Sequence, residues 1–281
     1  MQSTQQQPPL NTLPLIPKLD SLLIELLQSL SPEEWQAPTV AKLWTVKDVA
    51  AHMLDTTLRG ISISRDGFFG EKAENIHSYT DLVAFLNNLN MNWTNAAKRI
   101  SPQLLISLLQ QSCKEYYAHL QTLDLYVPAV FSVAWAGQET SPNWFHIARE
   151  YTEKFIHQQQ IRDAVSKQAL LTKELFLPFI DTFMYALPHT YRNVNAATGA
   201  TVKVIVTSEA GGEWKICKEE SGWQLVPSIA AESDATLSVS PNIVWKLFSK
   251  SMQPQDALPF VELAGDKTLA ATALQMVSVM A

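Results

Sequence analysis

A carboxylate and an imidazole one helical turn apart are the first residues in this sequence that could do chemistry. Glu153 and His157 lie in the stretch 150–165, whose apolar residues recur at helical spacing. Residues four apart lie on the same face of a helix. This face could offer one oxygen and one nitrogen ligand to a single metal ion. Because such pairs also arise by chance and two ligands make a poor site, a third ligand must come from another element.

An earlier helix supplies a third ligand. His52 lies in an otherwise apolar helix that Thr45 opens, with Asp48 at the position of a capping-box acid. A lone histidine of this kind is usually a buried structural residue. With Glu153 and His157, however, it makes a His2Glu set that leaves one coordination position open. That pattern is typical of catalytic zinc, whereas structural zinc takes four protein ligands.

Two carboxylates flank His52 on its own helix. Asp48 lies one turn before it, and Asp55 lies almost one turn after it. Either carboxylate could orient the imidazole by accepting its second N–H, as partners of metal-bound histidines commonly do.

Three further residues could transfer a proton or bind a substrate near the metal. His146 lies two turns before Glu153 and could act as an acid or a base, although a solvent-facing histidine is the simpler interpretation. Arg59 and Arg149 could each bind a substrate carboxylate through two hydrogen bonds. Arginines at such positions are more often surface or ion-pairing residues.

The N-terminal part of the chain is expected to form a bundle of four long helices. Apolar residues recur at helical spacing, and Ser-Pro pairs at 31–32, 101–102 and 141–142 mark helix starts. The predicted helices cover 15–30, 45 to the region of Gly67, 79–123 with a restart at 101–102, and 141–165. Metal sites in bundles form between facing helices, so the second and fourth helices are expected to face each other.

The pattern changes after residue 172. A predicted helix at 175–187 precedes alternating, strand-like stretches at 202–206, 213–217, 223–226 and 235–239, and helices are predicted at 241–250 and 267–280. Strands followed by helices favour a small α+β domain. The expected organisation is therefore a disordered tail at 1–13, a helical bundle at 14–168 and an α+β domain at 169–281.

The composition of the chain limits the classes of partner that we expect. The chain has 281 residues, 47% of them hydrophobic, and a net charge of -6, which suits a globular protein of two domains. Neither half is basic, so nucleic acid is not expected as a partner. No apolar run reaches the length of a membrane span, so no membrane is expected either. The N-terminus lacks a signal-peptide pattern and the two cysteines form no motif, which favours the cytoplasm.

Two stretches resemble a known family. Residues 44–52, WTVKDVAAH, resemble the tryptophan-led second-helix signature of the mycothiol-dependent maleylpyruvate isomerase family, and residues 153–164, EKFIHQQQIRDA, resemble its fourth-helix signature. The resemblance implies a DinB-like metal-binding four-helix bundle followed by an α+β domain resembling sterol carrier protein 2. It also implies that His52, Glu153 and His157 bind the metal and that a low-molecular-weight thiol is a co-substrate.

The function that this resemblance implies is a metal-dependent, thiol-dependent isomerase or S-transferase. The divalent metal, expected to be zinc, would bind the thiol as a thiolate, which would then attack a small electrophile. Two alternatives stay open: a hydrolase that uses metal-bound water, and a non-catalytic protein that binds a metal or a small ligand. Arg192 is the single arginine after residue 172, and this scarcity weakens the assignment to an isomerase of a dicarboxylate.

Overall fold

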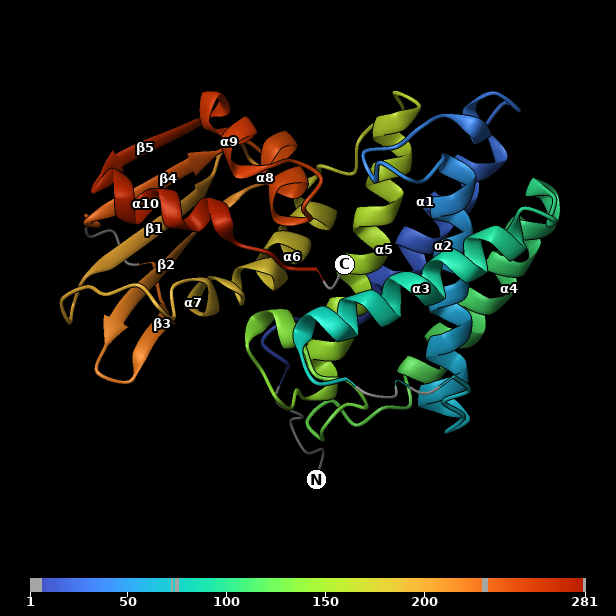
Figure 1. Ribbon diagram of the computed structural model, residues 1–281, viewed down its shortest axis with the longest axis horizontal. Helices are drawn as coiled ribbons and strands as arrows, with labels where there is room; N and C mark the ends of the chain where they lie inside the picture. The colour runs from blue at the N-terminus through green and yellow to red at the C-terminus, as the bar shows by residue number, and fades with distance from the viewer. Residues whose placement is uncertain (1–6, 72, 74–75, 229–231, 280–281) are drawn as a thin grey trace. The chain divides into compact units, whose positions relative to one another are not determined.

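The computed structural model describes residues 7–71, 73, 76–228 and 232–279 (Figure 1). The described chain divides into two compact units, one made of residues 7–131 and 142–169 and the other of residues 132–141 and 170–279. Segment 132–141, which lies inside the expected bundle, therefore belongs with the second unit. Residues 1–6 of the expected tail lie outside the described residues, and Leu13–Leu15 forms a short 3-10 helix, η1.

The first unit is helical, as predicted. Its long helices, among the residues described, are α1 (Ile16–Gln28), α2 (Val46–Gly60), α3 (Tyr79–Ala97), α4 (Pro102–Leu120) and α5 (Asn143–Ala164). Helix α2 packs against α3, α4 and α5, and α1 packs against α4 and α5 (Figure 1). The bundle is thus formed by α1, α2, α4 and α5, with α3 packed on α2 as an additional helix.

The stretch 79–123 forms two helices, so the described unit has five long helices where four were expected. The break falls at Ser101-Pro102. Proline has no backbone N–H to continue a helix, but it fits the first turn of a new one. The Ser101 hydroxyl accepts a hydrogen bond from the backbone N–H of Leu104 at 3.2 Å and caps α4.

The start of α2 is held by the predicted capping box. The Thr45 hydroxyl accepts from the Asp48 N–H at 3.3 Å, and the Asp48 carboxylate accepts from the Thr45 N–H at 3.0 Å. Inside the helix, Val46, Val49 and Leu54 are fully buried in the bundle core. The cap and the buried face together set where His52 lies.

The second unit is an α+β domain, as predicted. Its helices are α6 (Lys173–Met184), α7 (Leu187–Thr190), α8 (Pro241–Phe248), α9 (Pro254–Ala257) and α10 (Lys267–Thr272). Its strands are β1 (Thr201–Val206), β2 (Gly212–Glu219), β3 (Gly222–Val226), β4 (Ala235–Val239) and β5 (Val261–Gly265). The sheet order is β3-β2-β1-β4-β5, with β1 and β4 parallel and the other pairs antiparallel (Figure 1).

One face of this sheet is buried under helices. Alternate residues of β1 and β4 are buried, including Val202, Val204 and Leu237. Helix α10 packs against β1, β4 and β5, and α7 packs against β3. Strand β5 is not predicted from the sequence. It is a short edge strand in which only Val261 and Leu263 are half-buried, so its alternation of apolar and polar residues is weak.

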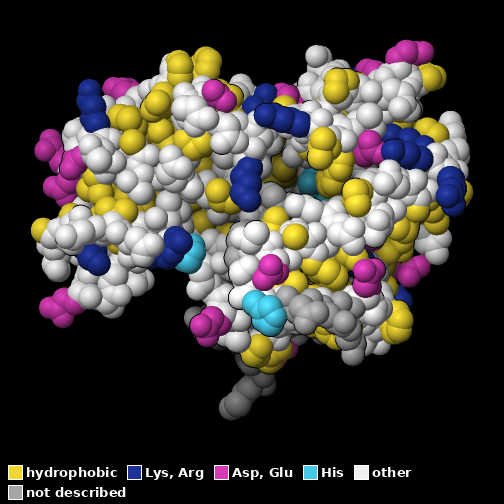
Figure 2. All heavy atoms as spheres, viewed as in Figure 1, with side chains coloured by type: hydrophobic (Ala, Val, Ile, Leu, Met, Phe, Trp, Pro, Cys, Tyr) yellow, Lys and Arg dark blue, Asp and Glu magenta, His cyan; other side chains and the backbone are white. Residues whose placement is uncertain are grey.

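The face of the molecule seen in Figure 2 has no single dominant charge. On the face shown in Figure 2, Lys and Arg side chains are interspersed with Asp and Glu side chains. No helix in the described part of the chain is both long enough and apolar enough to cross a membrane.

Candidate functional site

Helices α2 and α5 bring His52 beside His157, and Glu153 lies near Nε2 of His157, one turn earlier on α5. The rings of His52 on α2 and His157 on α5 lie edge to face, with their centroids 4.7 Å apart. On α5 itself, Oε2 of Glu153 lies 3.4 Å from Nε2 of His157. The predicted contact between the second and last bundle helices is therefore formed.

His157 is oriented by a residue that the sequence interpretation missed. Its Nδ1 lies 2.9 Å from Oε1 of Gln160, an atom that can only accept a hydrogen bond, so the Nδ1–H donates. In a neutral ring, the lone pair of Nε2 would then face the Glu153 carboxylate. Two acceptors facing each other need a shared cation, which is either a second proton on the ring or a metal ion. The i to i+3 spacing of His157 and Gln160 is the signal that could have identified this partner.

His52 has the properties of an imidazole kept neutral. Burial lowers the pKa of His52 well below its usual value, and the nearby positive charges of His157 and Arg59 lower it further, while a hydrogen bond with Asn90 opposes them. Its Nδ1 is buried without a hydrogen-bond partner. Neutral imidazole is the form that binds metals.

Glu153 has the properties of an ionised carboxylate. Burial raises the pKa of Glu153, but the hydrogen bond and charge of His157, with the charge of Arg149, outweigh this effect and hold the pKa below its usual value. The Glu153 side chain is 25% exposed and is directed to His157. A carboxylate in this state can serve as an anionic ligand.

The donor types of His52, Glu153 and His157 are ones that a divalent metal takes, but their atoms do not converge on one point. Among the described residues, no group of three His, Cys, Asp or Glu side chains is placed to hold an ion. The buried, unpartnered Nδ1 of His52 and the facing acceptors of His157 and Glu153 are nonetheless groups that a cation would satisfy. Two imidazoles and one carboxylate are also ligands that zinc prefers.

Trp44 covers the histidine pair. Its ring centroid lies 4.7 Å from that of His52 and 6.4 Å from that of His157. Trp44 also packs against the bundle core. Its ring therefore forms an apolar wall beside the two imidazoles.

A narrow hollow inside the bundle reaches Glu153 and His157. Its free volume is about 10 Å³, which is room for roughly one water molecule. It is lined by Leu23, Met53, Thr56, Thr57, Leu109, Cys113, Glu150, Glu153, Lys154 and His157. A larger ligand at the histidine pair must therefore displace side chains, and it enters an environment with little water.

The two carboxylates expected to orient His52 have other partners. Asp48 belongs to the cap of α2 and also accepts from the Thr45 hydroxyl at 2.8 Å. Oδ2 of Asp55 lies 2.9 Å from Nε of Arg59, one turn along the same helix. Neither carboxylate accepts a hydrogen bond from Nδ1 of His52, which has no partner in the described structure.

His146 is buried, contrary to the simpler expectation of a solvent-facing ring. It is 4% exposed, and Nη2 of Arg149 lies 3.2 Å from its Nδ1. Burial, followed by the charges of Arg149 and His119, lowers the pKa of His146 to about 3. An efficient acid or base titrates near the working pH, so this ring is poorly suited to proton transfer at neutral pH.

Arg149 is also bound to a carboxylate rather than free to hold a substrate. Its Nη2 lies 2.5 Å from Oε1 of Glu150, and the two side chains are 17% and 13% exposed. Glu150 in turn forms a hydrogen bond with Tyr116, whose pKa burial raises well above its usual value. The predicted clamp is therefore part of a buried network between α4 and α5.

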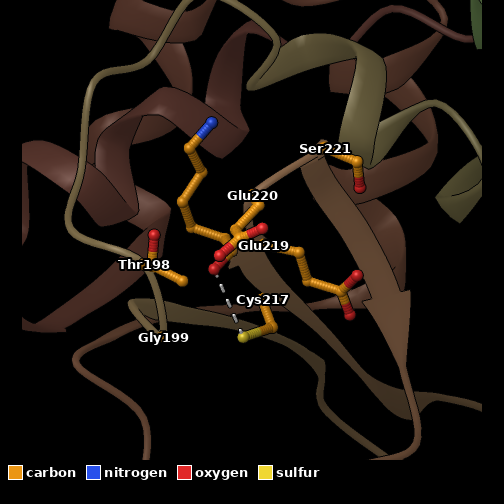
Figure 3. A pocket seen from close by; sticks show the side chains of 7 residues that line it. Thr198, Gly199, Cys217, Glu219, Glu220 and Ser221 are labelled. Atoms are coloured by element: carbon orange, nitrogen blue, oxygen red, sulfur yellow. Dashed lines mark hydrogen bonds between the residues drawn. The ribbon is translucent and has the colours of Figure 1, made fainter.

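A second, shallow hollow lies on the β2–β3 hairpin (Figure 3). Its lining residues are Thr198, Gly199, Cys217, Lys218, Glu219, Glu220 and Ser221. The side chains lie around the turn without converging on one point, and Cys217 makes only a long contact, 3.9 Å, with the Lys218 carbonyl. This hollow offers no pair of groups that would act together chemically.

Comparison with known proteins agrees with the helical fold of the first unit. A family model described as the mycothiol maleylpyruvate isomerase N-terminal domain matches residues 17–162, which is more than half of the chain and includes all three candidate ligands. The chain belongs to this family. The match covers the maleylpyruvate isomerase-like helical unit and not the sheet of the second unit.

Solved structures extend the likeness to both units. The crystal structures of the mycothiol-dependent maleylpyruvate isomerase and of its H52A mutant each align with a TM-score of 0.54 at 12% identity, over 90% of this chain and 91% of that chain. At this identity, the likeness establishes that the fold is that of the maleylpyruvate isomerase, and it carries no substrate or mechanism. A comparison with curated protein sequences gives no match.

Proposed function

We propose that this protein is a metal-dependent and thiol-dependent isomerase or S-transferase that acts on a small electrophile. The observation that carries the proposal is the arrangement of His157, held by Gln160 on one side and facing Glu153 on the other, with neutral His52 beside it. The family membership supports it, since a structural neighbour is named as a mycothiol-dependent isomerase.

His52, Glu153 and His157 would hold one divalent metal, expected to be zinc, and leave one position for an exogenous ligand. When bound, the metal would supply the positive charge that keeps a coordinated thiol ionised near neutral pH. Around it, Gln160 fixes the ring of His157, and Trp44 forms an apolar wall beside the histidine pair. Little competing water means that a thiolate nucleophile keeps its reactivity.

The reaction begins when the thiolate sulfur forms a bond to an electron-poor carbon. In an isomerase, the electron pair of the carbon–carbon double bond moves to the neighbouring carbon, the resulting single bond rotates, and the pair returns as the carbon–sulfur bond breaks. In an S-transferase, the carbon–sulfur bond is kept and a leaving group departs, or a proton is taken up. The two outcomes use the same site and differ in the electrophile.

The metal is tested by elemental analysis of the purified protein and of His52→Ala, Glu153→Ala and His157→Ala. We expect about one divalent ion per chain in the wild type and loss of most of it in each variant, with His119→Ala as a control outside the site. Full metal content in all three ligand variants would contradict the assignment.

The thiol is tested by turnover of the metal-loaded protein with a panel of electrophiles, with and without cellular thiols. We expect turnover only with a thiol. Turnover of esters or amides without a thiol would indicate the hydrolase, and a metal-loaded protein with no turnover on any of them would indicate a binding protein.

A further inference from the structure

We infer that the electrophile bound in the helical unit carries no charge, so that a dicarboxylate is not its substrate. This inference rests on the proposed function and narrows its substrate class. It follows from the way in which the basic side chains around the site are already neutralised.

Among its described lining residues, the hollow beside Glu153 has one lysine or arginine, Lys154. Its Nζ lies 2.6 Å from Oδ1 of Asp20 and 3.5 Å from Sγ of Cys113. The side chains of Lys154 and Asp20 are 9% and 13% exposed, so little water screens their attraction. The charge of Lys154 is therefore matched within the protein.

The two arginines predicted to bind a substrate carboxylate are matched in the same way. Arg149 is paired with Glu150, and Arg59 is paired with Asp55, whose side chain is only 11% exposed. Nε of Arg149 has no hydrogen-bond partner. This N–H could donate one hydrogen bond to a ligand, but the charge of Arg149 is already balanced by Glu150.

Glu153 is the lining carboxylate whose ion-pair partner is His157 and not one of these lysine or arginine side chains. A divalent metal, the Glu153 carboxylate and one thiolate together carry no net charge. The rest of the lining offers little to an anion, because Leu23, Met53 and Leu109 are apolar. The hydroxyls of Thr56 and Thr57 already donate to the Met53 carbonyl, at 3.1 and 2.8 Å.

An electrophile with two carboxylates would bring two unmatched charges into this dry space. Removing a carboxylate from water without a partner is costly, and breaking an existing buried pair to supply a partner is costly as well. An uncharged electrophile meets neither cost. The site therefore favours a neutral unsaturated carbonyl compound or another neutral alkylating molecule.

The test compares dimethyl maleate with maleate, which share a carbon skeleton. The metal-loaded full-length protein and a thiol are incubated with each, and formation of the trans isomer and of the thiol adduct is measured relative to the same thiol without protein. We expect the rate enhancement for the diester to exceed that for the dianion by about a hundredfold or more. An equal or larger enhancement for maleate overturns the inference.

A binding measurement separates this inference from the proposed function. Dimethyl succinate and succinate cannot react with a thiol, and their binding to the metal-loaded protein is followed by calorimetry. Preferential binding of the diester is expected, while preferential binding of succinate, or no preference, overturns the inference. Failure of both maleates to react with any thiol counts against the proposed function, and the binding result still decides on charge.

One variant removes a carboxylate that neutralises an arginine near the site. Glu150→Gln removes the partner of Arg149, so the preference for the diester over the dianion should fall by about tenfold. The matched control is Asp66→Asn, which removes one of the two carboxylates paired with Arg65 at an exposed position and should leave the preference unchanged. An unchanged preference in folded Glu150→Gln contradicts the role given to the Arg149 pair.

Discussion

At the scale of single residues, the neighbours of each histidine determine what it can do. Gln160 takes the Nδ1–H of His157 and leaves Nε2 toward Glu153, while His52 is buried with an unused Nδ1. His146 is equally buried, but its Nδ1 lies beside Arg149. Three histidines of one bundle therefore have different hydrogen-bonding environments, because their neighbours differ.

His146 should make the stability of the protein depend on pH. Its folded-state pKa of about 3 lies below the usual value of 6.5, so the unfolded chain binds a proton first as the pH falls. Its contribution to stability is complete above pH 6.5 and is lost progressively toward pH 3. Each pH unit in that window costs about 1.4 kcal/mol.

Denaturant unfolding at pH 7.5 and pH 5 checks this prediction. Between these values, the loss of unfolding free energy in His146→Gln should be smaller than in the wild type by about 2 kcal/mol. Part of the dependence should persist, because burial lowers the pKa of His52 in the same direction. The same loss in both proteins would show that His146 does not titrate as described.

At the scale of elements, caps and breaks follow directly from local chemistry. The capping box of Thr45 and Asp48 starts α2 as predicted, and Ser101-Pro102 separates α3 from α4. Strand β5 is the counterexample, since it is recognisable mainly through its pairing with β4. Elements with strong local signals can be predicted from the sequence, whereas an edge strand depends on its neighbour.

Gly60 at the end of α2 offers a test of helix packing. Alanine in place of glycine usually stabilises a helix by about 1 kcal/mol. Here the added Cβ would lie 2.6 Å from Cζ of Tyr116, whose ring is 2% exposed and has little space to move. We expect Gly60→Ala to lower the unfolding free energy by about 1–3 kcal/mol.

Thermal or denaturant unfolding measures this change. The exposed helical position Asn92 provides the control, because Asn92→Ala adds helix propensity without a steric conflict. A Gly60→Ala protein more stable than the wild type would mean that Tyr116 moves freely.

At the scale of the whole molecule, the two units are not contiguous in sequence. Segment 132–141 lies between α4 and α5 in the chain but belongs to the unit that contains the sheet. Within that unit, the Trp135 ring lies 6.1 Å from the ring of Phe183, and Trp135 is 5% exposed. A boundary at residue 169 therefore does not by itself separate the units.

Ending the chain at residue 169 should reveal this arrangement. The shortened protein should keep its helical circular dichroism, but Trp135 should become exposed because Phe183 is absent. Quenching of tryptophan fluorescence by acrylamide should increase relative to the full chain, and Trp135→Phe in the shortened chain should remove the increase. No increase would mean that the segment is packed by the helical unit alone.

The sequence by itself determined the local geometry of this protein. The spacing of Glu153 and His157 places them one turn apart on any helix, and the caps of α2 and α4 depend on residues three positions apart. Only the tertiary structure decided that His52 meets His157 and that His146 is buried. It also decided that Arg59 and Arg149 are each paired with a carboxylate. The physical reason is that spacing along a helix is set by backbone hydrogen bonds, whereas burial and charge pairing depend on which distant helix faces pack together.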